Sequence, residues 1–307
     1  MSMGSVDLGR VGIWTGVLDA LPSAQGVEFV AEAEELGYGA FWIPEAVGRD
    51  PFVAAARLLE GTSTIKVATG IANIYARDPM TMANIQRTIE EAFPQRFLLG
   101  LGVSHHHLVE FIRKHDYSRP LSYMREYLER MGKARFMAHG PQELPEIVLA
   151  ALGPKMLELS ATATAGAHPY FVPPEHTAVA RETMGPDAAL YPEQMAILDT
   201  NAESARALAR KNMAIYLGLP NYADNLLRLG FTQADIDGGP DGGPTDKLVD
   251  AIVVWGTEED VKARVDAHFE AGADHVCVQV LAPNPEAAFD GWRRLAPALC
   301  GSEAAPA

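Results

Sequence analysis

Short runs of β-branched and aromatic residues alternate along the chain with longer stretches of helical periodicity, many of which end in glycine. This alternation is typical of successive βα units. Eight of the apolar runs suit buried parallel strands, which read as nearly continuous hydrophobic segments. They cover residues 11–16, 40–44, 65–71, 97–102, 146–152, 168–172, 194–199 and 274–280.

The stretches between these runs predict helices. Met82, Ile85 and Ile89 share one helical face and follow Asp78, a suitable N-cap, and Pro79, which suits a first helical position. Eight strands alternating with helices predict an α/β fold of the closed (β/α)8 TIM-barrel type. An open dinucleotide-binding sheet is disfavoured, because GIWTGVLDALP follows the first run in place of G-x-G-x-x-G.

The length of 307 residues and the 48% of hydrophobic positions suit one barrel domain over residues 1–307. About seventy residues separate the last two runs, and they contain LPNYADNLLRLGF and the glycine-rich IDGGPDGGPT. We therefore expect an insertion at about 201–250, between the seventh and eighth strands. Such a long connection is either a lid or interface element or a tolerated surface excursion.

Composition narrows the function classes. With 25 Lys and Arg against 40 Asp and Glu, the net charge of −15 argues against a nucleic-acid partner. No apolar run approaches the roughly 18 residues of a membrane helix, and no signal-peptide pattern opens the chain, so we expect a soluble cytoplasmic protein. Two cysteines provide neither a disulfide framework nor a paired-cysteine zinc site.

Chemistry in such a barrel is expected at the carboxyl ends of the strands. In VATGIANIYARDP (67–79), Gly70 interrupts a β-branched run, which often marks a bulge or the close approach of a ligand. Asn73, Tyr75 and Arg77 then place polar groups on one alternating face. The alternative is a loop whose polar groups are merely solvated.

Ser104 and three consecutive histidines follow the fourth run. Successive helical side chains point about 100° apart, so at most two of the histidines face one site, and their spacing does not suit a metal. His105 could donate a proton or a hydrogen bond, or it could belong to a solvated helix start capped by Ser104. Near Thr177, another helix start could bind an anion or simply be capped.

The stretch TGIANIYARDP resembles the T-G-[VI]-x-N-x-Y-x-R-x-P segment of the bacterial luciferase-like flavin and F420 family. LGLG (99–102), ALGPKML (151–157) and residues 254–280 resemble further family segments in the same order. The resemblance thus spans nearly the whole chain. FWIPEA, GLGVSHHH, LPNY and DHVCVQVL resemble a branch of probable F420-dependent oxidoreductases.

This resemblance implies a homodimeric enzyme that uses coenzyme F420, or alternatively FMN, on a small organic substrate. It implies a non-prolyl cis peptide at Gly70-Ile71 behind the flavin ring, and a backbone cradle for the cofactor phosphate at 151–156, where a helix N-terminus suits an anion. The cofactor-binding residues that we expect are Gly70, Ile71, Asn73, Ser104, His105, Leu152, Gly153, Pro154, Lys155, Met156 and Thr177.

Two departures from the family pattern affect the proton chemistry. Glu45-Ala46 stands where many F420 relatives have Asp-His, and Val103 lies near the position of a glutamate in sugar-phosphate-oxidising relatives. Glu45 and His105 are therefore the candidate catalytic residues. The leading hypothesis is hydride transfer between the deazaflavin and a small substrate. The alternatives are an FMN-dependent monooxygenase and, because of the two departures, a flavin-binding barrel without catalysis.

Overall fold

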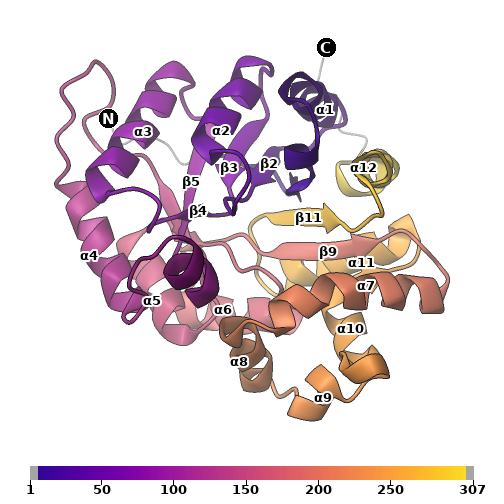
Figure 1. Ribbon diagram of the computed structural model, residues 1–307. Helices are drawn as coiled ribbons and strands as arrows, with labels where there is room; N and C mark the ends of the chain where they lie inside the picture. Colours follow the sequence, from indigo (N-terminus) through magenta and orange to yellow (C-terminus); the bar gives the residue numbers. More distant parts are fainter. Residues whose placement is uncertain (1–5, 302–307) are drawn as a thin grey trace.

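A parallel sheet surrounded by helices forms the centre of the computed structural model, which describes residues 6–301 (Figure 1). The strands are β1 (Val11–Trp14), β2 (Ala40–Ile43), β3 (Lys66–Thr69), β4 (Ala72–Asn73), β5 (Phe97–Gly102), β6 (Ile147–Leu149), β7 (Gly166–Ala167), β8 (Ala189–Leu190), β9 (Glu193–Ile197), β10 (Val253–Trp255) and β11 (Val276–Val280). The strand order is β10-β9-β11-β1-β2-β3-β5-β6-β7-β8, and β4 pairs with β5.

The two ends of this order meet in one continuous segment, because only Tyr191 and Pro192 separate β8 from β9. On one side of the segment, Tyr191 N donates to Ala167 O at 2.9 Å, next to the pairing of β8 with β7. On the other side, Cys277 N donates to Pro192 O at 3.1 Å, next to the pairing of β9 with β11. The sheet therefore returns on itself, which confirms the predicted α/β barrel.

The structure corrects one predicted strand position and adds a strand that was not predicted. The sixth strand is β7, and the predicted run 168–172 is a loop. Phe171 has a φ of 61°, which an extended strand does not accommodate, and Pro169 has no N–H for a ladder. In addition, β10 was not predicted. It pairs with β9, with Val253 opposite Met195, on the side of β9 away from β11. The sixth strand, β7, pairs with β8 and ends before β9 begins, so β10 occupies the position next to β9.

Helices of the βα units cover the outside of the barrel (Figure 1). They are α1 (Ser23–Glu35), α2 (Pro51–Glu60), α3 (Pro79–Ala92), α4 (Pro120–Gly132), α5 (Pro154–Ala163), α6 (Pro174–Met184), α11 (Glu258–Glu270) and α12 (Pro285–Leu299). Two short helices, η1 (Val17–Ala20) and η2 (His107–Ile112), instead follow the carboxyl ends of β1 and β5. Helix α3 starts as predicted, since Asp78 Oδ1 accepts hydrogen bonds from Met80 N and Thr81 N. None of the described helices is long and apolar enough to cross a membrane.

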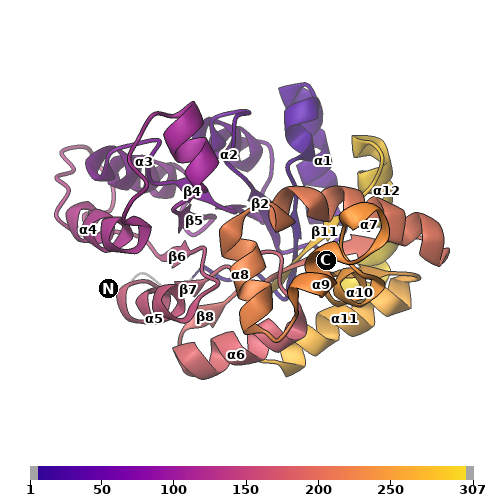
Figure 2. The same cartoon turned by 60° about the horizontal axis from the view of Figure 1, so that its bottom comes forward.

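The expected insertion between the seventh and eighth strands of the prediction is helical. It consists of α7 (Ala202–Leu217), α8 (Pro220–Arg228), α9 (Gln233–Asp237), η3 (Pro240–Gly242) and α10 (Asp246–Ile252), which lie together on one side of the molecule (Figure 2). Met213, Leu226 and Leu248 are buried in a hydrophobic cluster with Met195 and Ile197 of β9. The insertion is thereby packed directly onto the barrel, beside the carboxyl end of β9.

Candidate active site

A β-bulge separates β3 from β4. Ala68 pairs with Leu98 and Ala72 pairs with Leu101, so four steps along β3–β4 match three steps along β5. The extra residue lies at Gly70-Ile71, as the glycine in the β-branched run predicted. The peptide bond between Gly70 and Ile71 is cis, as the family resemblance implied.

Polar side chains replace the ladder around this bulge. Thr69 Oγ1 donates to Gly100 O at 2.7 Å and accepts from Gly100 N at 2.9 Å. Trp14 Nε1 donates to Gly70 O at 3.1 Å. A Cβ atom on Gly70 would approach Trp14 Nε1 to 2.5 Å and His168 Nε2 to 3.1 Å, so the packing leaves no space for a larger residue there.

A cavity of about 310 Å³ lies at the carboxyl ends of the strands, against this bulge. Parts of the barrel strands and their loops form most of its wall, and α7 and α8 of the insertion complete it. The lining residues are Trp14, Pro44, Glu45, Ala46, Gly70, Ile71, Val103, Ser104, His105, Leu108, Ala150, Ala151, Leu152, Met156, His168, Tyr170, Tyr216, Asn221 and Tyr222. Position and composition suit a small-molecule site.

Seven of the twelve predicted site residues line this cavity: Glu45, Gly70, Ile71, Ser104, His105, Leu152 and Met156. The other five lie elsewhere. Gly153, Pro154 and Lys155 begin α5 just beyond the cavity, and Lys155 is exposed. Asn73 is buried, and its Oδ1 accepts from Tyr75 N. Thr177 Oγ1 contacts His268 Nδ1 at 2.8 Å between α6 and α11, so the structure does not bring this hydroxyl to the site.

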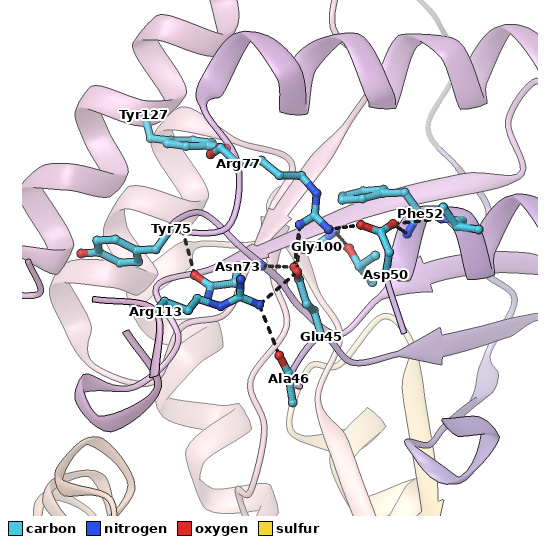
Figure 3. A network of polar contacts seen from close by, with 12 residues as sticks. Glu45, Ala46, Asp50, Phe52, Asn73, Tyr75, Arg77, Gly100, Arg113 and Tyr127 are labelled. Atoms are coloured by element: carbon cyan, nitrogen blue, oxygen red, sulfur yellow. Dashed lines mark hydrogen bonds and ion pairs between the residues drawn. The ribbon is translucent and has the colours of Figure 1, made fainter. Parts of the chain in front are cut away.

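Glu45 lies at the centre of a polar network at the end of β2 (Figure 3). Both of its carboxylate oxygens lie 2.9 Å from Arg77 Nη1, Arg113 Nη2 lies 3.6 Å from Oε1, and Asn73 N donates to Oε2 at 2.8 Å. Arg77 also pairs with Asp50. The Glu45 side chain is only 6% exposed. These contacts favour a positioning role, in which Glu45 holds the residues after the bulge, over proton transfer.

The three histidines have different environments. His105 lines the cavity, and its ring lies 5.5 Å from that of Tyr222. Burial lowers the pKa of His105, although the Asn221 side chain opposes that shift. His106 and His107 instead face Glu110 and Phe111 and are exposed. The neutral imidazole of His105 is thus the available proton acceptor of the three at neutral pH.

Ser104 has a role other than the helix cap considered from the sequence. Its φ of 58° is left-handed, and the π-helix η2 has no side-chain cap. The Ser104 carbonyl accepts a hydrogen bond from Tyr117 Oη at 2.9 Å. Left-handed backbone at a non-glycine residue is costly and is concentrated at functional sites. This turn directs His105 into the cavity.

Sequence reasoning missed several polar and aromatic lining residues. His168 Nδ1 donates to Tyr191 O at 2.7 Å, so Nε2 carries the lone pair, and within residues 6–301 that nitrogen has no hydrogen-bond partner. Burial lowers the pKa of His168 to about 4. The sequence could have indicated Trp14, because it is an aromatic residue at the end of a strand, where ligands are commonly contacted. No sequence pattern indicated that Tyr216 of the insertion would line the cavity.

A fully buried carboxyl group, Glu193, lies beside these residues at the start of β9. Its Oε2 accepts from Phe171 N at 3.2 Å, while Oε1 finds no partner among the described residues. Burial raises the pKa of Glu193 to about 8, although the Phe171 hydrogen bond opposes the shift. At neutral pH this side chain is therefore mainly a neutral acid within the barrel.

Next to the cavity, the N-terminus of α5 carries positive potential without a side-chain cap. The Arg228 guanidinium of α8 lies over it, with Nη2 3.5 Å from the position that a Cβ of Gly153 would take. In the described part of the chain no carboxylate forms an ion pair with Arg228. A cation at the positive end of a helix is unfavourable by itself. The Arg228 guanidinium and the N-terminus of α5 together therefore suit an anion bound between them.

Together, these features define an α/β barrel with a cavity at the carboxyl ends of its strands, next to which lie the uncapped N-terminus of α5 and Arg228. Residues 1–275 match the family described as luciferase-like monooxygenase, and the chain belongs to this family. The resemblance predicted from TGIANIYARDP and the later segments is thereby confirmed.

Named relatives and solved structures agree with this assignment. The chain is 26% identical over 273 residues to a putative coenzyme F420-dependent oxidoreductase of Mycobacterium tuberculosis, covering 73% of this chain and 78% of the relative. It is 29% identical over 300 residues to the 5,10-methylenetetrahydromethanopterin reductase of Archaeoglobus fulgidus, covering 84% and 88%.

The solved structures share the fold at lower identity. An F420-dependent secondary alcohol dehydrogenase in complex with an F420-acetone adduct has a TM-score of 0.75 at 12% identity, with 94% and 98% of the two chains covered. The oxygenating constituent of 3,6-diketocamphane monooxygenase from Pseudomonas putida, in complex with FMN, has a TM-score of 0.69 at 15% identity, with 97% and 100% covered.

Proposed function

We propose that this chain is an F420-dependent oxidoreductase that transfers a hydride between the deazaflavin and a small organic substrate. The observation that carries the proposal is the cavity against the Gly70-Ile71 bulge, with the uncapped N-terminus of α5 and Arg228 directly beside it. The relatives named as F420-dependent enzymes support it. When bound, the deazaflavin supplies the hydride chemistry, and the protein supplies orientation and proton transfer.

The residues present fit such a cofactor. A planar ring system suits the apolar wall of Trp14, Ile71, Leu152 and Met156, and His168 Nε2, which lacks a hydrogen-bond partner among residues 6–301, is a buried acceptor in the same wall. The uncapped α5 N-terminus and Arg228 suit the cofactor's phosphate.

Replacing Arg228 by glutamine will weaken F420 binding about tenfold or more, because a charge-assisted contact to the phosphate is lost. Fluorescence titration measures this affinity. The phosphate-free deazaflavin chromophore provides the ligand control, and its affinity will stay unchanged. Arg130→Gln, an exposed position on α4, provides the protein control. Equal losses for both ligands would place Arg228 outside the phosphate site.

Replacing His105 by glutamine will lower kcat/KM about 100-fold in the direction that removes a proton from the substrate. The neutral imidazole is the active form, and burial holds its pKa below the ordinary value of about 6.5. The wild-type rate will therefore fall only at acid pH, as the ring becomes protonated, and His105→Gln will lose that limb. If His105→Gln still loses activity at acid pH, the acid limb is due to the titration of another group. His107→Gln, exposed and outside the cavity, serves as the control.

Anaerobic turnover tests the function itself. We expect reduced F420 to be oxidised when the protein is mixed with carbonyl acceptors, with recovery of the absorbance of the oxidised deazaflavin. A parallel reaction with reduced FMN and dioxygen tests the monooxygenase alternative. Dioxygen uptake with product formation only in that reaction would favour the monooxygenase, and the absence of turnover in both would favour a binding protein without catalysis.

A further inference from the structure

The cavity wall lacks net charge. No lysine, arginine or aspartate belongs to the wall that the described residues form, and Glu45 is its one acidic side chain. The charge of Glu45 is offset by ion pairs with Arg77 at 2.9 Å and Arg113 at 3.6 Å. An ionised group placed in this cavity would lose its hydration without gaining a counter-ion, which is strongly unfavourable.

The insertion adds three aromatic and polar side chains to this neutral wall. Tyr216 comes from the last turn of α7, and Asn221 and Tyr222 come from α8. The centroid of the Tyr222 ring lies 5.5 Å from that of His105 and 5.4 Å from that of Tyr216. The Tyr222 ring therefore lies between the His105 and Tyr216 rings on one wall of the cavity. The substrate-facing surface is therefore built in part by a segment that the barrel does not need for closure.

A hydrogen-bonded chain anchors the Tyr216 hydroxyl. Tyr170 Oη lies 2.7 Å from Tyr216 Oη and donates to Gln279 Oε1 at 2.8 Å. Each tyrosine hydroxyl has only one proton, so the Tyr216 hydroxyl donates to Tyr170 and keeps lone pairs available. Because Tyr216 is partly exposed and lines the cavity, its oxygen can accept a hydrogen bond from a bound alcohol. To donate to a carbonyl, the chain must reverse: Tyr170 then donates to Tyr216, and the Gln279 amide turns so that its NH2 group donates to Tyr170.

We propose that the substrate of this chain is an uncharged, largely apolar carbonyl compound or the corresponding alcohol, whose oxygen forms a hydrogen bond with the Tyr216 hydroxyl. The reaction class rests on the proposed function. The neutrality of the substrate and the contact of its oxygen with Tyr216 are instead inferred from the residues that line the cavity. Ionised substrates of the same size are excluded by the cavity, and the insertion residues select the shape of the apolar part.

Three ring compounds of similar size test this proposal on the full chain, alone and with oxidised F420. Cyclohexanone is the neutral carbonyl probe, cyclohexanecarboxylate is the anionic one, and methylenecyclohexane is the hydrocarbon of similar shape. Affinities are measured by ligand-observed NMR. We expect cyclohexanone to bind about tenfold or more tightly than the carboxylate. Tyr216→Phe will weaken cyclohexanone binding about fivefold to tenfold and leave methylenecyclohexane unchanged.

Tyr123→Phe is the matched control, because it removes a tyrosine hydroxyl that does not line the cavity, and it will leave all three affinities unchanged. Equal or tighter binding of the carboxylate, or binding of none of the probes, overturns the proposal. An unchanged cyclohexanone affinity in Tyr216→Phe overturns the oxygen contact. F420 titration of the same samples reports separately on the proposed function, so failure of one can be told from failure of the other.

Discussion

Replacing Glu193 by glutamine will stabilise the protein at pH 8.5 by several kcal/mol while leaving its stability near pH 4.5 almost unchanged. Burial raises the pKa of Glu193 in the folded state to about 8, from an ordinary value of 4.5. Below pH 4.5 the carboxyl group is neutral in both the folded and the unfolded state. As the pH rises from 4.5 to 8, the unfolded chain loses this proton while the folded protein keeps it, so the free energy of unfolding falls. At about 1.4 kcal/mol per pH unit, the upper bound of the loss is about 5 kcal/mol.

Glutamine is neutral over this whole range, and its amide oxygen still accepts the hydrogen bond from Phe171 N. Denaturant unfolding at pH 5, 6.5 and 8.5 measures the difference between the variant and the wild type. Glu60→Gln, exposed on α2, sets the baseline for a surface replacement. A difference between Glu193→Gln and the wild type that does not change with pH would show that Glu193 is ionised or solvated in the folded protein.

Replacing Glu45 by glutamine will lower the free energy of unfolding by about 1–3 kcal/mol, because the largely buried Arg77 then loses one of its two counter-ions and keeps only Asp50. It will also lower kcat/KM about 100-fold, since the residues after the bulge lose the carboxylate that positions them. Glu45 holds them at two points: its own N donates to Ile71 O at 3.2 Å, and its carboxylate accepts from Asn73 N, the second contact being visible in Figure 3.

A pH profile separates this positioning role from acid–base catalysis. If Glu45 only positions the bulge, the rate of Glu45→Gln will fall equally at every pH, and the acid limb of the profile will keep its pKa. If Glu45 transfers the proton, the acid limb will disappear. Arg113→Gln is the control within the network. Because its ion pair is longer and more exposed than that of Arg77, its loss will cost at most about 1 kcal/mol.

The sequence was sufficient where burial dictates the pattern. Strands such as β2 and β5 read as continuous apolar runs because both faces of a closed parallel sheet are covered. The sixth strand was misplaced because β7 consists of Gly166 and Ala167, which carry no β-branched signal, while the aromatic loop after it resembles a strand. The bulge was predictable, since Gly70 breaks a β-branched run.

The candidate site was only partly predictable, because much of it depends on contacts between distant segments. Ser104 and His105 follow a strand end, so their place at the cavity could be inferred from barrel topology alone. Tyr216 and Tyr222 reach the cavity because the insertion packs against Met195 and Ile197, which no local pattern encodes. The position of the Thr177 hydroxyl away from the cavity was unpredictable for the same reason. Its helix start was predicted, but its partner His268 lies 91 residues away.

Equilibrium binding of F420 and FMN to the purified protein tests the central claim most directly. Intrinsic protein fluorescence reports on the cavity, since Trp14 forms part of its wall. We predict saturable binding of F420 that is tighter than that of FMN and is weakened in Arg228→Gln. Saturable binding of FMN with no binding of F420 would contradict the account.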